Sequence, residues 1–335
     1  MRFFCIVSLF IAGASANVRL DPITPVTVPV YKTGDLNNKT FHLNPGAKLA
    51  WLTCHDVEYQ LFVHDPVQCI YISGFAYYLH KWECSNVHKI IETLRSSPHG
   101  DRTTFLDLGA NIGAYTVPVA KSGFRVVGFE PLPYNQELLA ANIGTFKLDQ
   151  HVQIYPVGVS NTSSEVCIIG SQLFNSGNGI IGTCRKGSQT ISTHTIDDVL
   201  MHRDLCYTVV KADIEGHELQ AFKGALKTVF QSDCPPELIL FEENNRESVE
   251  VKDFVESFGY QCSLIPRTRD YACTRIKETY DKNSGVSKVV IDDDDEWVTP
   301  TDHFYYVYDI IDELRGLRGM KPLPRKPHQT AFTHI

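Results

Sequence analysis

The fold is decided by the stretch Thr104–Pro131, which reads TFLDLGANIGAYTVPVAKSGFRVVGFEP. A short apolar run over Phe105–Leu108 ends in the small-residue turn Gly109–Gly113, and a helical pattern of apolar residues follows. A second apolar run over Val126–Phe129 closes with Glu130. Strand, glycine turn, helix, strand and acid in this order predict one βαβ unit of an α/β domain.

The turn and the acid together predict a nucleoside pocket. Glycines let the backbone approach a ligand closely, and the start of the helix offers unpaired N–H groups. Glu130 follows Gly109 by 21 positions, where a carboxylate can accept both hydroxyls of an adenosine ribose. The spacing Gly-x-Asn-x-Gly lacks the third glycine of the dinucleotide fingerprint, so S-adenosylmethionine, which carries no phosphate, fits better. The alternative is a glycine turn without a ligand.

Three ordered motifs resemble the FkbM family of S-adenosylmethionine-dependent methyltransferases: DLGANIG, GFEPLPYN and VVKADIEGHE. The similarity extends from about Val57 to about Asp309. It implies the class I methyltransferase fold, a Rossmann-like α/β fold with a seven-stranded sheet, and an activity that is mainly O-methylation. The residues that the resemblance assigns to donor binding are Asp107, Gly109, Ala110, Asn111, Gly113, Glu130 and Pro131.

Candidate catalytic groups follow the apolar run Tyr207–Ala212, where the segment DIEGHE opens a helix predicted over Glu218–Phe230. Ligands of open α/β sheets bind outside the carboxyl ends of strands, so this segment should lie beside the glycine turn. Methyl transfer to a hydroxyl needs an in-line approach and removal of the hydroxyl proton. Asp213, Glu215 and His217 are the candidates, and His217 is the natural general base near neutral pH. The alternative is helix capping by the two carboxylates.

A second acidic strand end suggests a further group at the site. The predicted strand Glu237–Phe241 is followed by Glu242, a candidate for positioning the substrate. Asp213, Glu242 and Asn244 could together hold one Mg²⁺ that lowers the pKa of the substrate hydroxyl. The spacing leaves the metal requirement unknown.

The chain divides by composition into a signal and four further parts. Residues 17–48 predict an extended leader, and residues 49–100 an N-terminal cap that contains an amphipathic helix over Trp82–Leu94. The methyltransferase domain is expected over 101–310, and a basic flexible tail over 311–335. Within the cap, Trp82-Glu83 resembles a pair that FkbM-like proteins carry, so Glu83 faces the substrate or caps the helix.

Later elements of the domain are predicted from shorter patterns. Val152–Val159 reads as the third strand, and residues 160–195 are too long for an ordinary connection, which predicts a small β insertion near the site. Residues 266–301 read as an irregular insertion. His303–Tyr308 is the predicted last strand of the sheet.

The N-terminus and the cysteines indicate export. Arg2, an apolar run and Ala14-Ser15-Ala16 predict a signal peptide over residues 1–16. Nine cysteines remain after Cys5, which predicts up to four disulfides and one odd thiol in an oxidising compartment. Asn38 and Asn161 begin glycosylation triplets. Without Arg2 the chain has 30 basic and 39 acidic side chains, a net charge of −9 that argues against nucleic acid.

The sequence therefore predicts a secreted or secretory-pathway methyltransferase that O-methylates a hydroxyl of a glycan or secreted metabolite. No further stretch is apolar enough to span a membrane. Two alternatives stay open: an NAD(P)-dependent oxidoreductase, and a catalytically silent secreted binding domain on a methyltransferase scaffold. The oligomeric state is not predicted.

Overall fold

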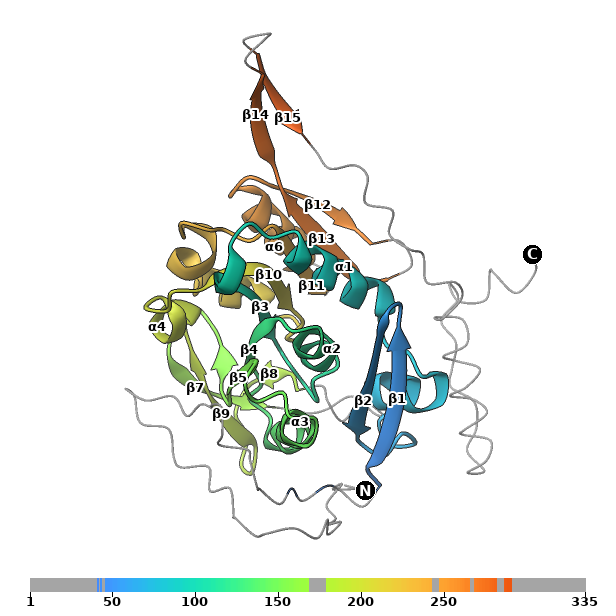
Figure 1. Ribbon diagram of the computed structural model, residues 1–335. Coiled ribbons are helices and arrows are strands. Elements are labelled where there is room, and N and C mark those ends of the chain that lie inside the picture. Colours follow the sequence, from blue (N-terminus) through green and yellow to red (C-terminus); the bar gives the residue numbers. More distant parts are fainter. Residues whose placement is uncertain are drawn as a thin grey trace, which may run out of the picture. The chain divides into compact units, whose positions relative to one another are not determined.

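A central sheet of seven strands organises the computed structural model, which describes residues 41, 43, 46–168, 179–242, 247–265, 268–281 and 286–290. The strand order is β12-β13-β11-β10-β3-β4-β5. In this sheet β13 runs in the opposite direction to the other six strands. The predicted α/β class I methyltransferase fold is confirmed (Figure 1). The strands are β3 (Thr103–Leu108), β4 (Arg125–Phe129), β5 (Val152–Tyr155), β10 (Cys206–Ala212), β11 (Leu238–Glu242), β12 (Tyr260–Leu264) and β13 (Asp270–Arg275).

Helices cover both faces of the sheet because side chains of each strand alternate between them. Phe105 belongs to the core beneath α1 (Cys84–Arg95), α2 (Thr116–Lys121) and α3 (Pro133–Thr145). Leu106 and Leu108 belong to the core beneath α4, α5 and α6. Every residue of β3 and β10 is buried, as expected for strands that are covered on two sides. The second set of helices spans Ile196–Leu200, Glu218–Lys223 and Glu247–Glu256.

The N-terminal cap begins with a hairpin that lies beside α2 and α3 (Figure 1). Its strands β1 (Lys48–Cys54) and β2 (Val57–Val63) pair antiparallel, and a π-helical segment, η1 (Ile70–Leu79), follows. A disulfide between Cys54 and Cys84 joins the hairpin to the first turn of α1. The cap is therefore part of the same core as the first three sheet helices.

The predicted β insertion is a four-stranded sheet of order β6-β9-β7-β8. The prediction of one strand over Val152–Val159 is wrong, because β5 and β6 belong to different sheets. Pro156 follows β5 and has no N–H for a ladder, which ends the pairing there. The insertion strands are β6 (Gly158–Val159), β7 (Ser164–Ile168), β8 (Ile181–Gly182) and β9 (Gln189–His194).

Two predictions near the C-terminal half are also corrected. The seventh strand is β13, inside the segment predicted to be irregular, and β14 (Lys277–Asp281) pairs with β15 (Val286–Val290). The predicted helix over Glu218–Phe230 breaks at Gly224 between α5 and a π-helical segment, η3 (Leu226–Phe230). A Cβ at Gly224 would lie 2.1 Å from the Ser160 carbonyl oxygen, so the insertion approaches the chain closely there. His303–Tyr308 lies outside the described residues.

The cysteine prediction is confirmed in number, with four disulfides and a buried free thiol at Cys69. Asn161 is exposed, whereas Asn38, the predicted signal peptide and the basic tail lie outside the described residues. Within the described residues, no helix has the length and apolar character that crossing a membrane requires. The other pairs are Cys167–Cys184, Cys206–Cys234 and Cys262–Cys273.

Candidate active site

The glycine turn and the Asp213 segment are in direct contact, as the sequence predicts. The Asp213 amide donates to the Leu108 carbonyl oxygen at 3.1 Å. A Cβ at Gly109 would lie 2.1 Å from the Asp213 carbonyl oxygen, and Gly109 has a φ of +83°. Glycine is required here because the two loops meet backbone to backbone, in a conformation that side chains disfavour.

Glu130 binds the backbone around it from the carboxyl end of β4. Its Oε2 accepts the Asn111 amide at 2.8 Å, and its Oε1 accepts the Leu132 amide at 2.9 Å. Asn135 adds a longer contact from Nδ2 to Oε1 at 3.4 Å. A carboxylate has about four acceptor positions, so about one remains for a ribose hydroxyl. Pro131 lies between Glu130 and Leu132 in this turn.

Burial is the largest influence on the pKa of Glu130. The side chain is 3% exposed. Loss of solvent raises the pKa of Glu130 to about 7, although the hydrogen bonds from the Leu132 and Asn111 amides act in the opposite direction. Glu130 therefore changes charge near neutral pH, which makes its ability to accept ribose hydroxyls dependent on pH.

A buried lysine that sequence reasoning did not single out lies beneath the site. Lys211 stands in register with Asp107 across β10 and β3. Its Nζ lies 3.9 Å from Asp107 Oδ1, 3.3 Å from Asp213 Oδ2 and 4.9 Å from the ring centre of Tyr115. The sequence signal is a lysine within the apolar run that ends β10. Asp107, expected at the donor, is 1% exposed and accepts the Thr116 hydroxyl at 2.7 Å.

Lys211 keeps its charge because acids surround it. Burial alone would lower the pKa of Lys211, but the charges of Asp213, Asp107 and Glu83 together raise it above its ordinary value. Burial raises the pKa of Asp107, and the charge of Lys211 opposes that effect. The pair is thus a buried ion pair at the base of the site.

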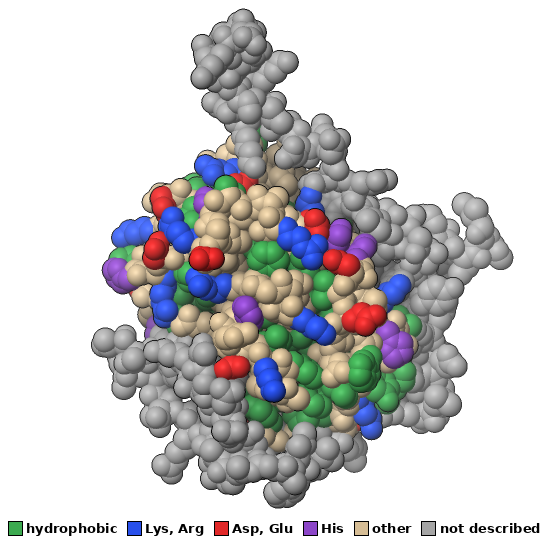
Figure 2. All heavy atoms as spheres, viewed as in Figure 1, with side chains coloured by type: hydrophobic (Ala, Val, Ile, Leu, Met, Phe, Trp, Pro, Cys, Tyr) green, Lys and Arg blue, Asp and Glu red, His purple; other side chains and the backbone are tan. Residues whose placement is uncertain are grey.

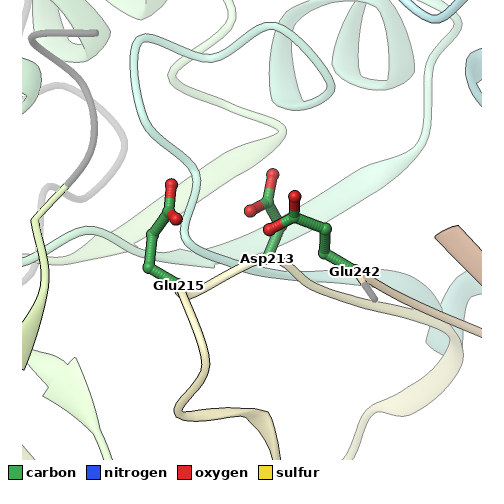
Figure 3. A group of neighbouring side chains, drawn as sticks. All are labelled: Asp213, Glu215 and Glu242. Carbon is green, nitrogen blue, oxygen red and sulfur yellow. The ribbon is translucent and has the colours of Figure 1, made fainter. Parts of the chain in front are cut away.

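Three half-buried carboxylates gather at the ends of β10 and β11, as Figure 3 shows. Asp213, Glu215 and Glu242 each offer an oxygen, and these atoms lie within 4.8 Å of one another. Arg269 lies 3.6 Å from Glu242 Oε1, so cations already contact two members of the group. Carboxylate oxygens suit Mg²⁺ or Ca²⁺. Asn244, the third ligand suggested by the sequence, lies outside the described residues.

Glu83 extends the site into the cap. It occupies the N-cap position of α1, but its side chain makes no capping hydrogen bond, so the capping alternative is wrong. Its Oε2 accepts the Tyr115 hydroxyl instead. Asn86 donates to Asp270 Oδ2 at 2.9 Å and to the Tyr115 hydroxyl at 3.2 Å. Asp270 is a site residue that sequence reasoning missed, because its strand was predicted to be irregular.

Glu83 and Asp270, the two acids on the cap side of the site, both have raised pKa values. Burial, followed by the charge of Asp270, raises the pKa of Glu83, and solvent contact of the Glu83 side chain weakens the shift. Burial and the charge of Asp213 raise the pKa of Asp270. Burial and the neighbouring acids thus favour the protonated forms of Glu83 and Asp270, although Lys211 opposes the shift of both.

His217 lies on the insertion side of the loop. Its Nε2 is 3.0 Å from Ser160 Oγ, and it is not a member of the three-carboxylate group. Burial lowers the pKa of His217, so the ring is neutral at pH 7. Asp213 and Glu215 both precede α5, and His217 occupies its N-cap position.

Part of this chain is similar to known methyltransferases. Residues 107–262 match the family model described as the Methyltransferase FkbM domain. Hexuronic acid methyltransferase AglP of Haloferax volcanii is 30% identical over 119 residues, which are 35% of this chain and 48% of that protein. The chain thus spans about half the length of the curated relative that it matches.

Solved structures with low sequence identity resemble parts of the chain. The N-terminal domain of human METTL16, in complex with SAH, is 11% identical with a TM-score of 0.35, covering 56% of this chain and 67% of that one. Precorrin-6y C5,15-methyltransferase from Geobacter metallireducens is 12% identical with a TM-score of 0.35, covering 62% and 97%. An rRNA methylase from Streptococcus thermophilus is 10% identical with a TM-score of 0.35, covering 59% and 96%.

One face of the molecule carries side chains of both charges. On the face shown in Figure 2, acidic, basic and histidine side chains are interspersed among apolar and polar atoms. A phosphate backbone is bound by clustered Lys and Arg, which that face does not display. The exclusion of nucleic acid stays a prediction from net charge.

Proposed function

We propose that this chain, whose residues 107–262 match the FkbM methyltransferase domain, transfers a methyl group from S-adenosylmethionine to a hydroxyl of a glycan or secreted metabolite. The contact between Gly109 and Asp213 supports the proposal best. It places the expected donor side of the site, which carries Glu130, next to the side that carries Asp213, Glu215 and Glu242. The four disulfides support action in an oxidising compartment.

The donor would be held by the turn and the carboxylate at the ends of β3 and β4. Glu130 would accept a ribose hydroxyl through its remaining acceptor position, while the turn backbone from Gly109 to Gly113 borders the nucleoside. S-adenosylmethionine, when bound, supplies an activated methyl group on a sulfonium. Asp107 would act indirectly, because its charge holds the Lys211 ammonium group in position.

The acidic group would receive the acceptor. Asp213 would take the hydroxyl proton, since its backbone contacts the glycine turn and its side chain belongs to the three-carboxylate group. Glu215 and Glu242 would orient neighbouring hydroxyls by accepting hydrogen bonds. His217 would stand at the insertion side, where its neutral ring can accept a proton or hold a hydroxyl through Ser160.

The charge of the site favours a neutral acceptor. Asp213, Glu215 and Glu242 crowd within 4.8 Å of one another. An anionic sugar placed beside them would pay like-charge repulsion unless a cation intervened. The acceptor named for the relative AglP is a hexuronic acid. We therefore expect this chain to prefer an uncharged hydroxyl compound, and an added divalent cation to widen the choice toward acidic sugars.

Calorimetry with S-adenosylhomocysteine and with NADH tests the donor. Binding of S-adenosylhomocysteine alone supports the proposal, binding of NADH would favour an oxidoreductase, and binding of neither would favour a silent scaffold. Mass spectrometry of neutral and acidic glycans, incubated with the enzyme and labelled donor, tests the acceptor. A labelled methyl group on nitrogen or carbon in place of oxygen would contradict the assigned reaction.

A further inference from the structure

Two buried polar side chains, His64 and Asn135, connect the N-terminal hairpin to Glu130. They reach Oε1 of that carboxylate, whereas the Asn111 amide donates to Oε2. His64 follows β2 directly and is 2% exposed, and Asn135 on α3 is fully buried. His64 Nε2 lies 3.0 Å from Asn135 Oδ1. Asn135 Nδ2 in turn donates to Glu130 Oε1 at 3.4 Å. The hairpin thus reaches the predicted ribose carboxylate through a continuous chain of hydrogen bonds.

The chemistry of the chain fixes the direction of each hydrogen bond. A carboxylate only accepts, so the Asn135 amide nitrogen must face Glu130 and its oxygen must face His64. Because that oxygen only accepts, His64 Nε2 must carry the proton and donate. Burial lowers the pKa of His64, which keeps the ring neutral and compatible with this tautomer. With its proton on Nε2, His64 therefore stabilises the orientation in which the Asn135 amide nitrogen faces Glu130.

A second bridge runs from the same strand to the glycine turn. Asn142 on α3 accepts the Phe62 amide at 2.6 Å and donates to the Phe62 carbonyl oxygen at 3.0 Å. Its Nδ2 also donates to the Ile112 carbonyl oxygen at 2.8 Å. The end of β2 is consequently hydrogen-bonded, through α3, to both parts of the predicted donor site.

A purely structural role would not require this polarity. Buried polar groups cost free energy unless they are hydrogen-bonded, and apolar side chains could attach the hairpin to α3 equally well. A series of polar side chains that are all hydrogen-bonded also fixes the orientation of the last side chain in the series. For His64 and Asn135, that last member is the Glu130 carboxylate.

We propose that His64 is a positioning residue for the methyl donor: through Asn135 it holds the Glu130 carboxylate in the orientation that receives a ribose hydroxyl. This inference rests on the proposed function, because it assigns Glu130 to the ribose. It makes the N-terminal hairpin part of the donor site, although the hairpin precedes the glycine turn in sequence and lies outside the matched family domain.

Two substitutions at His64 separate the hydrogen bond from the packing. His64→Gln keeps an N–H near the position of Nε2, whereas His64→Phe keeps a flat ring and removes the donor. Calorimetry should show that His64→Phe weakens S-adenosylhomocysteine binding by about threefold to tenfold, the effect of one hydrogen bond. His64→Gln should stay within about twofold of the wild type. Should the Phe variant not fold, His64→Asn, which is too short to reach Asn135, replaces it.

The 2′,3′-dideoxy analogue of S-adenosylhomocysteine tests whether the effect passes through the ribose. His64→Phe should leave binding of that analogue unchanged. In a Glu130→Gln background, His64→Phe should cause little further loss, because coupled residues are not additive. Equal losses for both ligands, or an unchanged dissociation constant, would overturn the inference while the proposed function stands. A wild-type chain that binds no S-adenosylhomocysteine would overturn the proposed function and this inference with it.

Discussion

The ammonium group of Lys211 lies 3.3 Å from Oδ2 of Asp213, two residues further along the same chain. Lys211 shares a face of β10 with Val209, which belongs to the core beneath α1–α3, and Asp213 follows the end of β10 directly. Asp107 in register on β3 completes the group from the neighbouring strand. Lys211 therefore links β3, which leads into the glycine turn, to β10, which leads into the loop of Asp213 and Glu215.

Replacing Lys211 by Met should strongly destabilise the fold. The substitution leaves Asp107, which is 1% exposed, as a buried acid without its cation, and breaking such a pair costs about 3–5 kcal/mol. Urea unfolding measures the change. Lys223→Met on the exposed side of α5 is the matched control and should change stability by less than about 0.5 kcal/mol. Equal effects of the two substitutions would show that Lys211 is not paired in this way.

Replacing Asp213 by Asn should reduce turnover rather than donor binding. The amide keeps the size of the side chain but cannot take a proton, so we expect kcat to fall by about 10²–10⁴. The dissociation constant for S-adenosylhomocysteine should remain nearly the same. The double substitution Asp213→Ala with His217→Ala should abolish turnover. Full activity of the double variant would exclude both residues from the mechanism.

Donor affinity should depend on pH through Glu130. Burial raises the pKa of Glu130 to about 7, and the ionised form accepts a ribose hydroxyl more strongly than the protonated form. Binding below that pH must therefore release a proton, and affinity should fall by up to about tenfold for each pH unit. Calorimetry in buffers of different ionisation enthalpy measures the release. Glu130→Gln should bind more weakly and show no such dependence.

The fold should lose stability as the pH rises through the weakly acidic range. Burial raises the pKa of Glu218 to about 7 from an ordinary value of 4.5, although its Oε1 accepts the Ile214 and Gly216 amides. Between these values the folded state holds a proton that the unfolded chain has released, so the free energy of unfolding decreases with pH. Urea titrations at pH 5 and at pH 7.5 measure the slope. Glu218→Gln keeps the acceptor oxygen and should reduce it.

Substituting the first glycine of the turn should separate backbone strain from the contact between loops. Gly109→Ala combines a φ of +83° with a Cβ only 2.1 Å from the Asp213 carbonyl oxygen. Gly123 has a φ of +91° and no atom within 4 Å of its Cβ position, so Gly123→Ala carries the strain alone. The control should cost about 1–2 kcal/mol in thermal unfolding. Gly109→Ala should cost more and weaken donor binding, whereas equal costs would contradict the close contact.

The sequence by itself determined the local elements and the resemblance to the FkbM family. The alternation of apolar runs, glycine turn and acid in Thr104–Pro131 specified the βαβ unit, because short-range hydrophobic periodicity and turn chemistry are written in neighbouring residues. The same reasoning found the pairing of the Gly109 turn with Asp213, because the carboxyl ends of parallel strands meet at one edge. The number of disulfides also followed from composition.

Only the tertiary structure decided which distant side chains share one environment. It brought Asp270 and Glu83 beside Tyr115, and it directed His217 to Ser160 instead of to the carboxylates. These relationships join residues far apart in sequence, and they depend on strand order, on register and on how the cap packs. Sequence periodicity shows which face of a helix or strand is buried, but not which other element packs against that face. The contacts of Lys211 with Asp213, and of His64 with Asn135, were therefore found only in the folded chain.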